Sequence, residues 1–258
     1  MSEPCGARLG PARAYPPRVS FPPPPPEFHP ALERLGVQLE PGDEARLGRY
    51  LELLQAGNER MNLTAIRDPA QAWIRHVQDS LSLVPFVASA EAETLIDVGS
   101  GGGLPGMVLA CALPSLRVTL LEATGKKARF LEETAAALGL SNVTVLNARA
   151  EEAGQDHKLH RERYHVAVCR AVGHLAILLE LALPLVRTGG TLLAVKGAKA
   201  AQEVAESAEA LRVLQAEVVD SVVTGTGTVV VVHKVARTPR MWPRLPGEPE
   251  RRPLGVPR

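Results

Sequence analysis

The sequence predicts an α/β protein in which a mostly parallel, doubly wound sheet follows an N-terminal helical region. Three observations predict this class. From residue 94 onward, short apolar runs alternate with helical patterns, which is typical of parallel strands joined by helices. A glycine-rich turn at 94–106, TLIDVGSGGGLPG, joins the first such strand to a helix. The last two apolar runs are linked only by residues 224–227, and so short a link requires antiparallel neighbours.

The composition limits the class of protein. The chain has 258 residues, enough for one large α/β domain with an appended piece. Hydrophobic residues make up 45%, which is sufficient for a sizeable core. Aromatic residues make up only 3%, so a protein that stacks many bases on aromatic rings is not expected. The formal net charge of +1 neither requires nor excludes nucleic acid, because a local basic surface can lie within a neutral total.

Cysteines and histidines indicate neither a disulfide framework nor a metal site. Cys5, Cys111 and Cys169 are scattered, which is typical of a reducing compartment. The histidines show no metal-ligand spacing; His157 and His160 could share a helix face, but no further ligand supports them. The sequence shows no signal peptide and no apolar run of membrane-spanning length. We therefore expect no bound metal, no membrane contact and a cytoplasmic location.

The two ends of the chain differ from its middle. Residues 1–30 are rich in proline, glycine and arginine, with consecutive prolines at 22–26, so a disordered or polyproline leader is expected. Residues 237–258 contain several arginines and too many prolines for a regular helix. This C-terminal tail is either a frayed end or an extended arm laid on phosphates, and the sequence leaves both alternatives open.

Residues 31–90 are expected to form the helical region. Apolar side chains recur at helical spacing over residues 41–61. A second helix follows Asp68, whose side chain is a good cap and which precedes a proline suited to the first helical turn. On this second helix, Arg75 and Asp79 are four residues apart and can pair on its surface.

Residues 91–236 are expected to form the sheet domain. Its strands are short apolar runs rich in β-branched residues. Its helices begin at capping residues such as Thr124 and end at glycines such as Gly139. The predicted strands are 94–98, 117–121, 143–147, 165–169, 191–196, 216–223 and 228–235, and the predicted longer helices are about 105–112, 124–138, 174–186 and 199–213.

The glycine turn fits two classes of ligand. Gly101, Gly103 and Gly106 match the dinucleotide pattern G-x-G-x-x-G, whereas Gly99, Gly101 and Gly103 match the G-x-G-x-G of S-adenosylmethionine (SAM) methyltransferases. Asp97 stands at the strand end, two residues before the first glycine. A carboxylate there would repel a pyrophosphate but attract the ammonium or sulfonium of SAM. The pattern therefore favours SAM over a dinucleotide.

Carboxylates at the ends of the next two strands are further ligand candidates. Glu122 ends the second strand, where a carboxylate would accept hydrogen bonds from a ribose diol. The alternative is an acidic residue favoured by a helix dipole. Ala150 and Glu151 follow the third strand, where a backbone amide and a carboxylate could bind adenine. The alternative for Glu151 is simply a helix start, and one sequence does not separate the two.

Basic residues follow the same strands. Arg170 follows the fourth strand and could orient the SAM tail or hold an RNA phosphate, the alternative being a structural ion pair. Lys196 ends the fifth strand and could contact a phosphate or cap the sheet edge. Lys126 and Lys127 lie in the first turn of a helix, where positive charge opposes the dipole. They indicate an external anion, or else a solvated basic surface.

Taken together and in order, these stretches resemble the RsmG (GidB) family. The resemblance covers about residues 40 to 254 and leaves only the leader outside. No single stretch is specific, but the set is. The stretches are NLTAI at 62–66, RHxxDSL at 75–81, DVGSGGGLPG at 97–106, KK at 126–127, RAE at 149–151, RAV at 170–172, KG at 196–197 and PRxPG at 243–247.

The resemblance implies a fold, an activity and a set of contacts. It implies a class I SAM-dependent methyltransferase fold and methylation of N7 of one guanine in 16S ribosomal RNA. Leu104 stands where phenylalanine is common in the family, and Glu122-Ala123 where Asp-Ser is common. The family's SAM contacts carry over to Gly99, Leu104, Ala150, Glu151 and Arg170, with Glu122 as the ribose ligand. The phosphate contacts are expected at Arg75, Lys126, Lys127, Lys196 and the tail, including Arg244.

Guanine N7 implies catalysis by positioning. This atom has an exposed lone pair and no hydrogen, so no general base is needed. No catalytic residue is therefore assigned, although Arg170 and Lys196 are candidates. The expected partner is 16S rRNA, in the small ribosomal subunit or its assembly intermediate, and the expected state is a monomer. The alternatives are a non-catalytic SAM or nucleotide sensor, a methyltransferase for another RNA or a small molecule, and a dehydrogenase.

Overall fold

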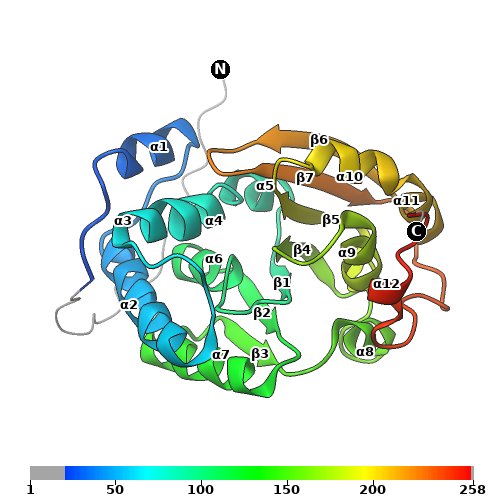
Figure 1. Ribbon diagram of the computed structural model, residues 1–258, viewed down its shortest axis with the longest axis horizontal. Helices are drawn as coiled ribbons and strands as arrows, with labels where there is room; N and C mark the ends of the chain where they lie inside the picture. Colours follow the sequence, from blue (N-terminus) through cyan, green and yellow to red (C-terminus); the bar gives the residue numbers. More distant parts are fainter. Residues whose placement is uncertain (1–20, 257–258) are drawn as a thin grey trace.

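One mixed sheet forms the centre of the computed structural model, which describes residues 21–256 (Figure 1). The strand order is β3-β2-β1-β4-β5-β7-β6. Neighbouring strands are parallel except at β7, which runs antiparallel to β5 and to β6, as the sequence predicted. The strands are β1 (Thr94–Val98), β2 (Arg117–Leu121), β3 (Val143–Leu146), β4 (Tyr164–Arg170), β5 (Val186–Lys196), β6 (Ala216–Val223) and β7 (Thr228–Lys234).

Helices cover both faces of this sheet, because successive strand residues point to opposite sides. On β1, Leu95 packs into one hydrophobic cluster and Ile96 into the other, and both side chains are fully buried. The cluster around Leu95 includes side chains of α2 (Asp43–Met61), α6 (Gly106–Ala112) and α7 (Gly125–Ala137). The cluster around Ile96 includes α8 (Ala150–Gln155), α9 (Leu175–Ala182), α10 (Ala200–Glu206) and α11 (Ala208–Leu214).

A continuous helix with a π-helical centre spans residues 69–81 in the N-terminal region. The Asp68 carboxylate caps it by accepting a hydrogen bond from the Gln71 N–H at 2.8 Å, as predicted. π-Helical turns are rare and occur often at functional sites. Among the described residues, no helix combines the length and the apolar character needed to cross a membrane. The segments are α3 (Pro69–Ala72), η1 (Trp73–Gln78) and α4 (Asp79–Leu81), and α5 (Val84–Ser89) follows.

The expected leader ends earlier than predicted. Helix α1 (Phe28–Arg34) begins within residues 1–30, and its Phe28 ring meets Trp73 edge-on with the ring centroids 5.2 Å apart. The Trp73 indole N–H donates to the Pro22 carbonyl at 2.8 Å. An aromatic partner and a hydrogen-bond donor on η1 thus hold a segment that composition alone placed in the leader. Residues 1–20 lie outside the described part of the chain.

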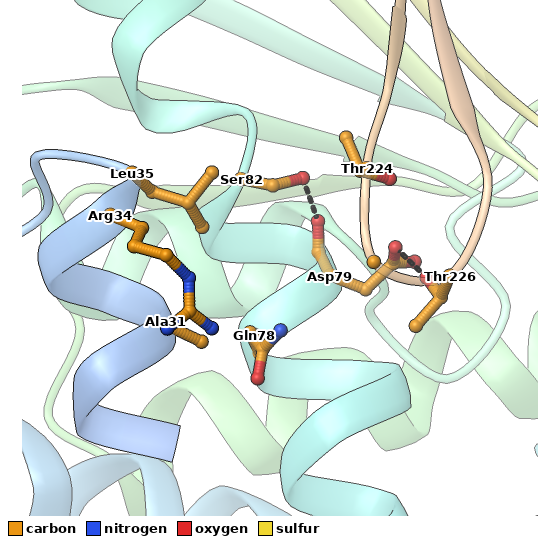
Figure 2. A pocket seen from close by; sticks show the side chains of 9 residues that line it. Ala31, Arg34, Leu35, Gln78, Asp79, Ser82, Thr224 and Thr226 are labelled. Atoms are coloured by element: carbon orange, nitrogen blue, oxygen red, sulfur yellow. Dashed lines mark hydrogen bonds between the residues drawn. The ribbon is translucent and has the colours of Figure 1, made fainter. Parts of the chain in front are cut away.

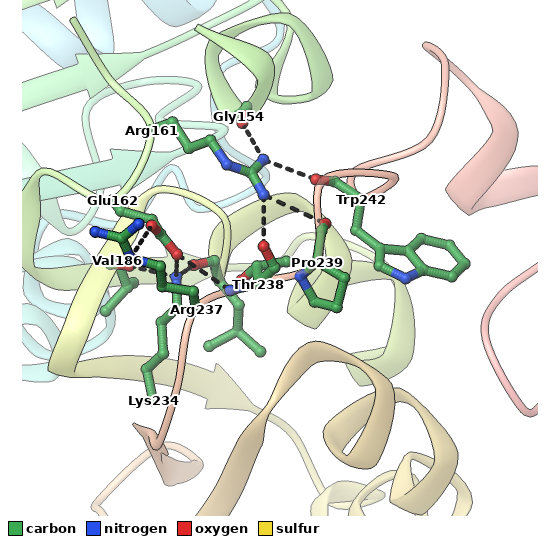
Figure 3. Close-up of polar contacts among 10 residues, drawn as sticks. Gly154, Arg161, Glu162, Val186, Lys234, Arg237, Thr238, Pro239 and Trp242 are labelled. Carbon is green, nitrogen blue, oxygen red and sulfur yellow. Dashed lines mark hydrogen bonds and ion pairs between the residues drawn. The ribbon is translucent and has the colours of Figure 1, made fainter. Parts of the chain in front are cut away.

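The described part of the C-terminal tail is not frayed, because it docks along α8 and α9 (Figure 1). Arg161 is buried and donates to the carbonyls of Thr238 at 2.8 Å and Trp242 at 2.7 Å (Figure 3). Further on, the Arg244 guanidinium binds both carboxylate oxygens of Glu180, at 2.9 and 2.6 Å. The tail contains one short helix, α12 (Glu248–Arg251).

The start of the tail is fixed by Lys234, the last residue of β7. Its buried ammonium donates to Glu162 Oε1 at 2.9 Å and to two carbonyls, Leu183 at 2.9 Å and Val186 at 2.7 Å (Figure 3). Burial lowers the pKa of Lys234 to about 8. The same Glu162 oxygen accepts the N–H of Thr238 at 3.1 Å. This buried set of polar groups joins the sheet to the tail.

Candidate active site

The glycine turn between β1 and α6 forms the centre of the candidate site. The main-chain N–H groups of Gly99 and Ser100 both donate to the Leu121 carbonyl, at 2.9 and 3.0 Å, which ties the turn to β2. Gly99, Gly101 and Gly103 have φ angles of 74°, 56° and 99°. Side chains with a Cβ rarely adopt this region, so the turn requires glycine at these positions.

The glycines of the turn have two different roles. A Cβ on Gly102 would come within 2.7 Å of Leu54, and one on Gly106 within 2.5 Å of Leu120, so these two glycines permit close packing. A Cβ on Gly101 would meet nothing closer than a carbonyl oxygen at 3.9 Å. Its backbone therefore faces open space, where a ligand can approach.

Asp97 is the buried carboxylate beneath this turn. Its side chain is fully inaccessible to solvent, and its Oδ2 accepts a hydrogen bond from the Gly106 N–H at 2.9 Å. Its Oδ1 is also buried and has no hydrogen-bond partner among the described residues. Burial raises the pKa of Asp97 to about 7, although the Gly106 N–H opposes this. A buried acceptor without a hydrogen-bond partner lowers the stability of the fold. A hydrogen bond from a cationic donor to Oδ1 would remove this penalty.

Glu122 lies at the same turn, at the end of β2. Its Oε2 accepts the Gly101 N–H at 2.9 Å and its Oε1 accepts the Thr124 N–H at 2.8 Å. The carboxylate thus joins the glycine turn to the start of α7. Each oxygen keeps a second lone pair with which it can accept from a ribose hydroxyl. The predicted ribose role stays a proposal, and the two main-chain bonds are a structural role that the sequence did not reveal.

Arg170 reaches from the end of β4 to the N-terminal helix. Its Nη1 donates to the Arg75 carbonyl at 2.8 Å and to Asp79 Oδ2 at 3.1 Å. Its Nη2 lies 3.1 Å from His76 Nδ1. The sequence suggested that Arg75 and Asp79 pair with each other, but Asp79 instead pairs with Arg170.

Comparison with known proteins identifies the family of this chain. The chain matches the family model described as rRNA small subunit methyltransferase G over residues 43–230. A ribosomal RNA small subunit methyltransferase G from Sorangium cellulosum is 45% identical over 221 residues, covering 85% of this chain and 92% of that protein. One from Chloroflexus aggregans is 45% identical over 224 residues, covering 85% and 93%. This chain belongs to the rRNA small subunit methyltransferase G family.

Membership in the rRNA small subunit methyltransferase G family confirms the predicted activity, that of a SAM-dependent rRNA methyltransferase. Solved structures confirm the class I methyltransferase fold. The crystal structure of an O-methyltransferase from Bacillus cereus in complex with SAH superimposes with a TM-score of 0.53 and 21% identity, covering 72% of this chain and 90% of that one. At that identity the likeness shows the fold alone.

Glu151 is held by the tail of this methyltransferase. Its side chain is buried and accepts hydrogen bonds from Arg149 Nη2 at 3.2 Å and from the Gly247 N–H at 2.8 Å. The carboxylate is thus turned toward α12. The main chain at Ala150 begins α8 directly after β3, and the adenine role predicted for Ala150 and Glu151 stays a prediction.

Two predicted phosphate ligands have internal partners instead. The Lys196 ammonium is buried and lies 2.7 Å from the Gly173 carbonyl and 2.7 Å from Glu203 Oε2. Arg244 forms the bidentate pair with Glu180 described above. Both cations therefore have structural ion pairs, and we leave them out of the proposed RNA contacts and, for Lys196, out of the catalytic candidates.

The other predicted phosphate ligands are accessible. Lys126 and Arg75 are exposed and Lys127 is half-buried. No side-chain hydrogen bond or ion pair is found for these three within residues 21–256. Lys126 and Lys127 lie in the first turn of α7, directly after the end of β2 that carries Glu122. Arg75 lies on η1, beside the Arg170 side chain. The two lysines thus follow the strand end whose Glu122 carboxylate binds the glycine turn, and Arg75 neighbours Arg170.

A separate cavity of about 150 Å³ lies between α1, α4 and the β6–β7 turn (Figure 2). Arg34, Gln78 and Asp79 line it, and Thr226 donates a short hydrogen bond to Asp79 Oδ1. Gln78 Oε1 is buried there without a partner in the described chain. Asp79 thus faces the cavity with one oxygen and Arg170 with the other. Within the described residues, no cluster of metal-ligating side chains is present.

Proposed function

We propose that this protein transfers a methyl group from SAM to N7 of a guanine in 16S rRNA. The observation that carries the donor site is the unpartnered Oδ1 of Asp97, on the strand that leads into a glycine turn with open space at Gly101. The buried carboxylate oxygen complements an ammonium group. The glycine turn, which has no side chains, lets a nucleoside approach the main chain. The residues present therefore fit SAM.

The site residues have distinct proposed roles. Asp97 accepts from the ammonium group, and Glu122 accepts from the ribose hydroxyls. Arg170 donates to the carboxylate of the methionine part, and the main chain of Gly99, Leu104 and Ala150 contacts the donor. Gly103 shapes the turn through its positive φ. When bound, SAM supplies an electrophilic methyl group on a sulfonium centre.

Catalysis at N7 requires orientation rather than proton transfer. The N7 lone pair is free at neutral pH, so the protein needs no general base to activate it. The side chains of Asp97, Glu122 and Arg170 fit a role in orientation, because hydrogen bonds to the protein hold each of them in place. N7 lies on the Hoogsteen edge, so the guanine must be unstacked or lie in incompletely assembled RNA.

The partner and the cellular setting follow from this substrate. We propose that small-subunit rRNA binds across Arg75, Lys126 and Lys127 while it is still accessible, in the subunit or in an assembly intermediate. We further propose that the protein acts as a monomer in the cytoplasm. A single copy of the chain supplies every proposed donor contact.

Mapping of N7-methylguanine tests the function directly. Purified protein and radiolabelled SAM are incubated with unmodified 16S rRNA, with assembling particles and with mature small subunits. Label at a single guanine, cleavable after reduction and aniline treatment, is the expected result for at least one substrate. Binding of SAM without any transfer to these RNAs would overturn the proposal and leave a SAM-binding protein.

A further inference from the structure

His76 uses both ring nitrogens in hydrogen bonds, and these fix its tautomer. Nδ1 lies 3.1 Å from Arg170 Nη2, and Nε2 lies 2.8 Å from Thr64 Oγ1. A guanidinium can only donate, so Nδ1 must accept. The ring proton therefore resides on Nε2 and is donated to Thr64. The ring is 3% exposed, so it does not contact RNA in this arrangement.

The surroundings keep this ring neutral. Burial, together with the adjacent Arg170 charge, lowers the pKa of His76 to about 4. An imidazole that stays neutral throughout the physiological range keeps Nδ1 available as an acceptor. His76 is thus suited to hold a cation in place and not to shuttle protons.

Arg170 retains donors for a ligand after these contacts are made. A guanidinium has five N–H donors. Three are used by the Arg75 carbonyl, Asp79 and His76. For the others, no acceptor is found among the described residues. The Arg170 charge also acts to lower the pKa of Asp97, so the guanidinium lies within electrostatic reach of the donor-site carboxylate.

We propose that His76, as the neutral Nε2–H tautomer, is a positioning residue that orients Arg170 so that its free donors bind the methionine carboxylate of SAM. Asp97 and Arg170 then form a pair of opposite charges that matches the ammonium and carboxylate of an amino acid. The π-helical turn of η1 brings His76 and the Arg75 carbonyl to the same guanidinium. This inference rests on the proposed function, which assigns SAM to the glycine turn.

Two amide substitutions separate the two hydrogen bonds of His76. The amide of asparagine occupies the place of Nδ1 in histidine, and the amide of glutamine occupies the place of Nε2. His76→Asn therefore keeps an acceptor for Arg170, whereas His76→Gln keeps only the partner of Thr64. SAM binding to each purified protein is measured by calorimetry, and RNA KM and kcat are measured in the methylation assay.

The expected order is specific. SAM affinity of His76→Asn should stay within about threefold of the wild type, and that of His76→Gln should fall about tenfold or more, as for the loss of a hydrogen bond to a charged group. Thr64→Val serves as a matched control, because it removes the other bond of the ring without touching Arg170. It should lower the melting temperature while SAM affinity stays within about threefold.

The results separate the failure of this inference from that of the function. A wild-type protein that does not bind SAM would overturn the proposed function. Wild-type binding with equal losses in both His76 variants, or with the larger loss in His76→Asn, would overturn the positioning role. A raised KM for RNA with unchanged SAM affinity in His76→Gln would assign Arg170 to the RNA, and so would also overturn the inference.

Discussion

At the scale of single residues, Asp97 couples the donor site to pH. The free protein holds this carboxyl fully buried, with one oxygen on Gly106 and the other unpaired. Because burial raises its pKa from 3.8 to about 7, the folded state holds the proton more tightly than the unfolded state. The contribution of this group to the stability of the free protein is thus present at low pH and is lost as pH rises through about 7.

The ionised form of Asp97 is the one that binds a cation, so SAM affinity should depend on pH. Below pH 7, each unit of acidification should weaken SAM binding by about tenfold, because the carboxyl must first lose its proton. Above pH 7 this effect levels off, until the α-amino group of SAM itself loses its proton near pH ~8. Calorimetric titration of SAM between pH 5.5 and 8.5 measures the profile.

Asp97→Asn is the control for this profile. An amide does not titrate, so the variant should bind SAM weakly and with no change between pH 5.5 and 7. The stability of the ligand-free variant should also no longer fall as pH rises toward 7. A profile in which wild type and variant run parallel would show that another group causes the pH dependence.

Glu151 makes a contact in the structure that its place in the chain did not predict. Its position after β3 predicted an adenine contact. In the structure the carboxylate accepts a hydrogen bond from the N–H of Gly247, which lies 96 residues further along the chain. A link of this kind has no local sequence signal, because it depends on where the tail docks.

At the scale of elements, a buried ion pair is one of the contacts that hold the tail. The Glu180 side chain is fully buried, and Arg244 contacts both of its oxygens. Arg244→Met would leave this carboxylate buried without its counter-ion, at a cost of about 3–5 kcal/mol in the free energy of unfolding. Urea denaturation of the wild type and the variant measures this difference.

The double variant Arg244→Met/Glu180→Gln separates the charge from the packing. Glutamine at position 180 can still accept the Arg244 main-chain N–H, which now bonds Glu180 Oε1 at 2.9 Å. We therefore expect it to recover most of the stability that Arg244→Met alone loses. If Arg244→Met alone lowers the free energy of unfolding by less than about 1 kcal/mol, the pair contributes no more than a solvent-exposed ion pair.

Strands were easier to predict than the ends of helices. β1 and β2 match their predicted bounds, because each is a short apolar run with a clear stop. β5 begins earlier than predicted, at Val186. The strand continues through Gly189 and Gly190, which lie in a bulge where the register with β4 shifts.

Two predicted helices were too long for local reasons. The helix predicted to end at Val186 stops at Ala182, because Pro184 lacks the N–H that the next turn would need. The helix predicted over 199–213 is divided at Ser207 into α10 and α11. The Ser207 hydroxyl donates to the Glu203 carbonyl at 2.6 Å, and such bonds bend helices.

The part of the candidate site that lies within one short motif could be predicted from the sequence. The contacts between segments far apart in the chain could not. The glycine turn and Asp97 are adjacent in sequence, and the structure keeps them together. By contrast, the pairing of Arg170 with Asp79 joins residues that are 91 positions apart. The RHxxDSL stretch showed that this helix carries polar residues, but the sequence could not show that His76 faces inward.

At the scale of the whole molecule, one hydrophobic core joins the N-terminal region to the sheet. Phe28, Trp73 and Leu81 belong to the same cluster as Leu95 and Val118 of the sheet. The Tyr50 hydroxyl also donates to the Gly102 carbonyl at 2.9 Å. The N-terminal helices therefore hold the glycine turn directly, and the exposed Arg75 keeps a fixed position relative to α7.

The net charge of +1 hides an uneven distribution of free cations. Lys196 and Arg244 are neutralised by carboxylates, whereas Arg75, Lys126 and Lys127 have no ion-pair partner within residues 21–256. Phosphate contacts release counter-ions, so RNA affinity should fall with salt in proportion to the number of contacts. This basic surface should set the salt dependence of RNA binding.

The double variant Lys126→Ala/Lys127→Ala tests that surface. If both lysines contact phosphates, the slope of log affinity against log salt should become shallower by about 1.4, because each contact to single-stranded RNA contributes about 0.7. SAM affinity should be unaffected, since neither side chain is assigned to the donor. Filter binding of 16S rRNA at several salt concentrations gives the slope.

The matched control is Arg163→Ala/Arg187→Ala. It removes two exposed charges where β4 and β5 begin, whereas the glycine turn follows the end of β1. A slope that changes equally in both double variants would show that RNA responds to total charge and not to this surface.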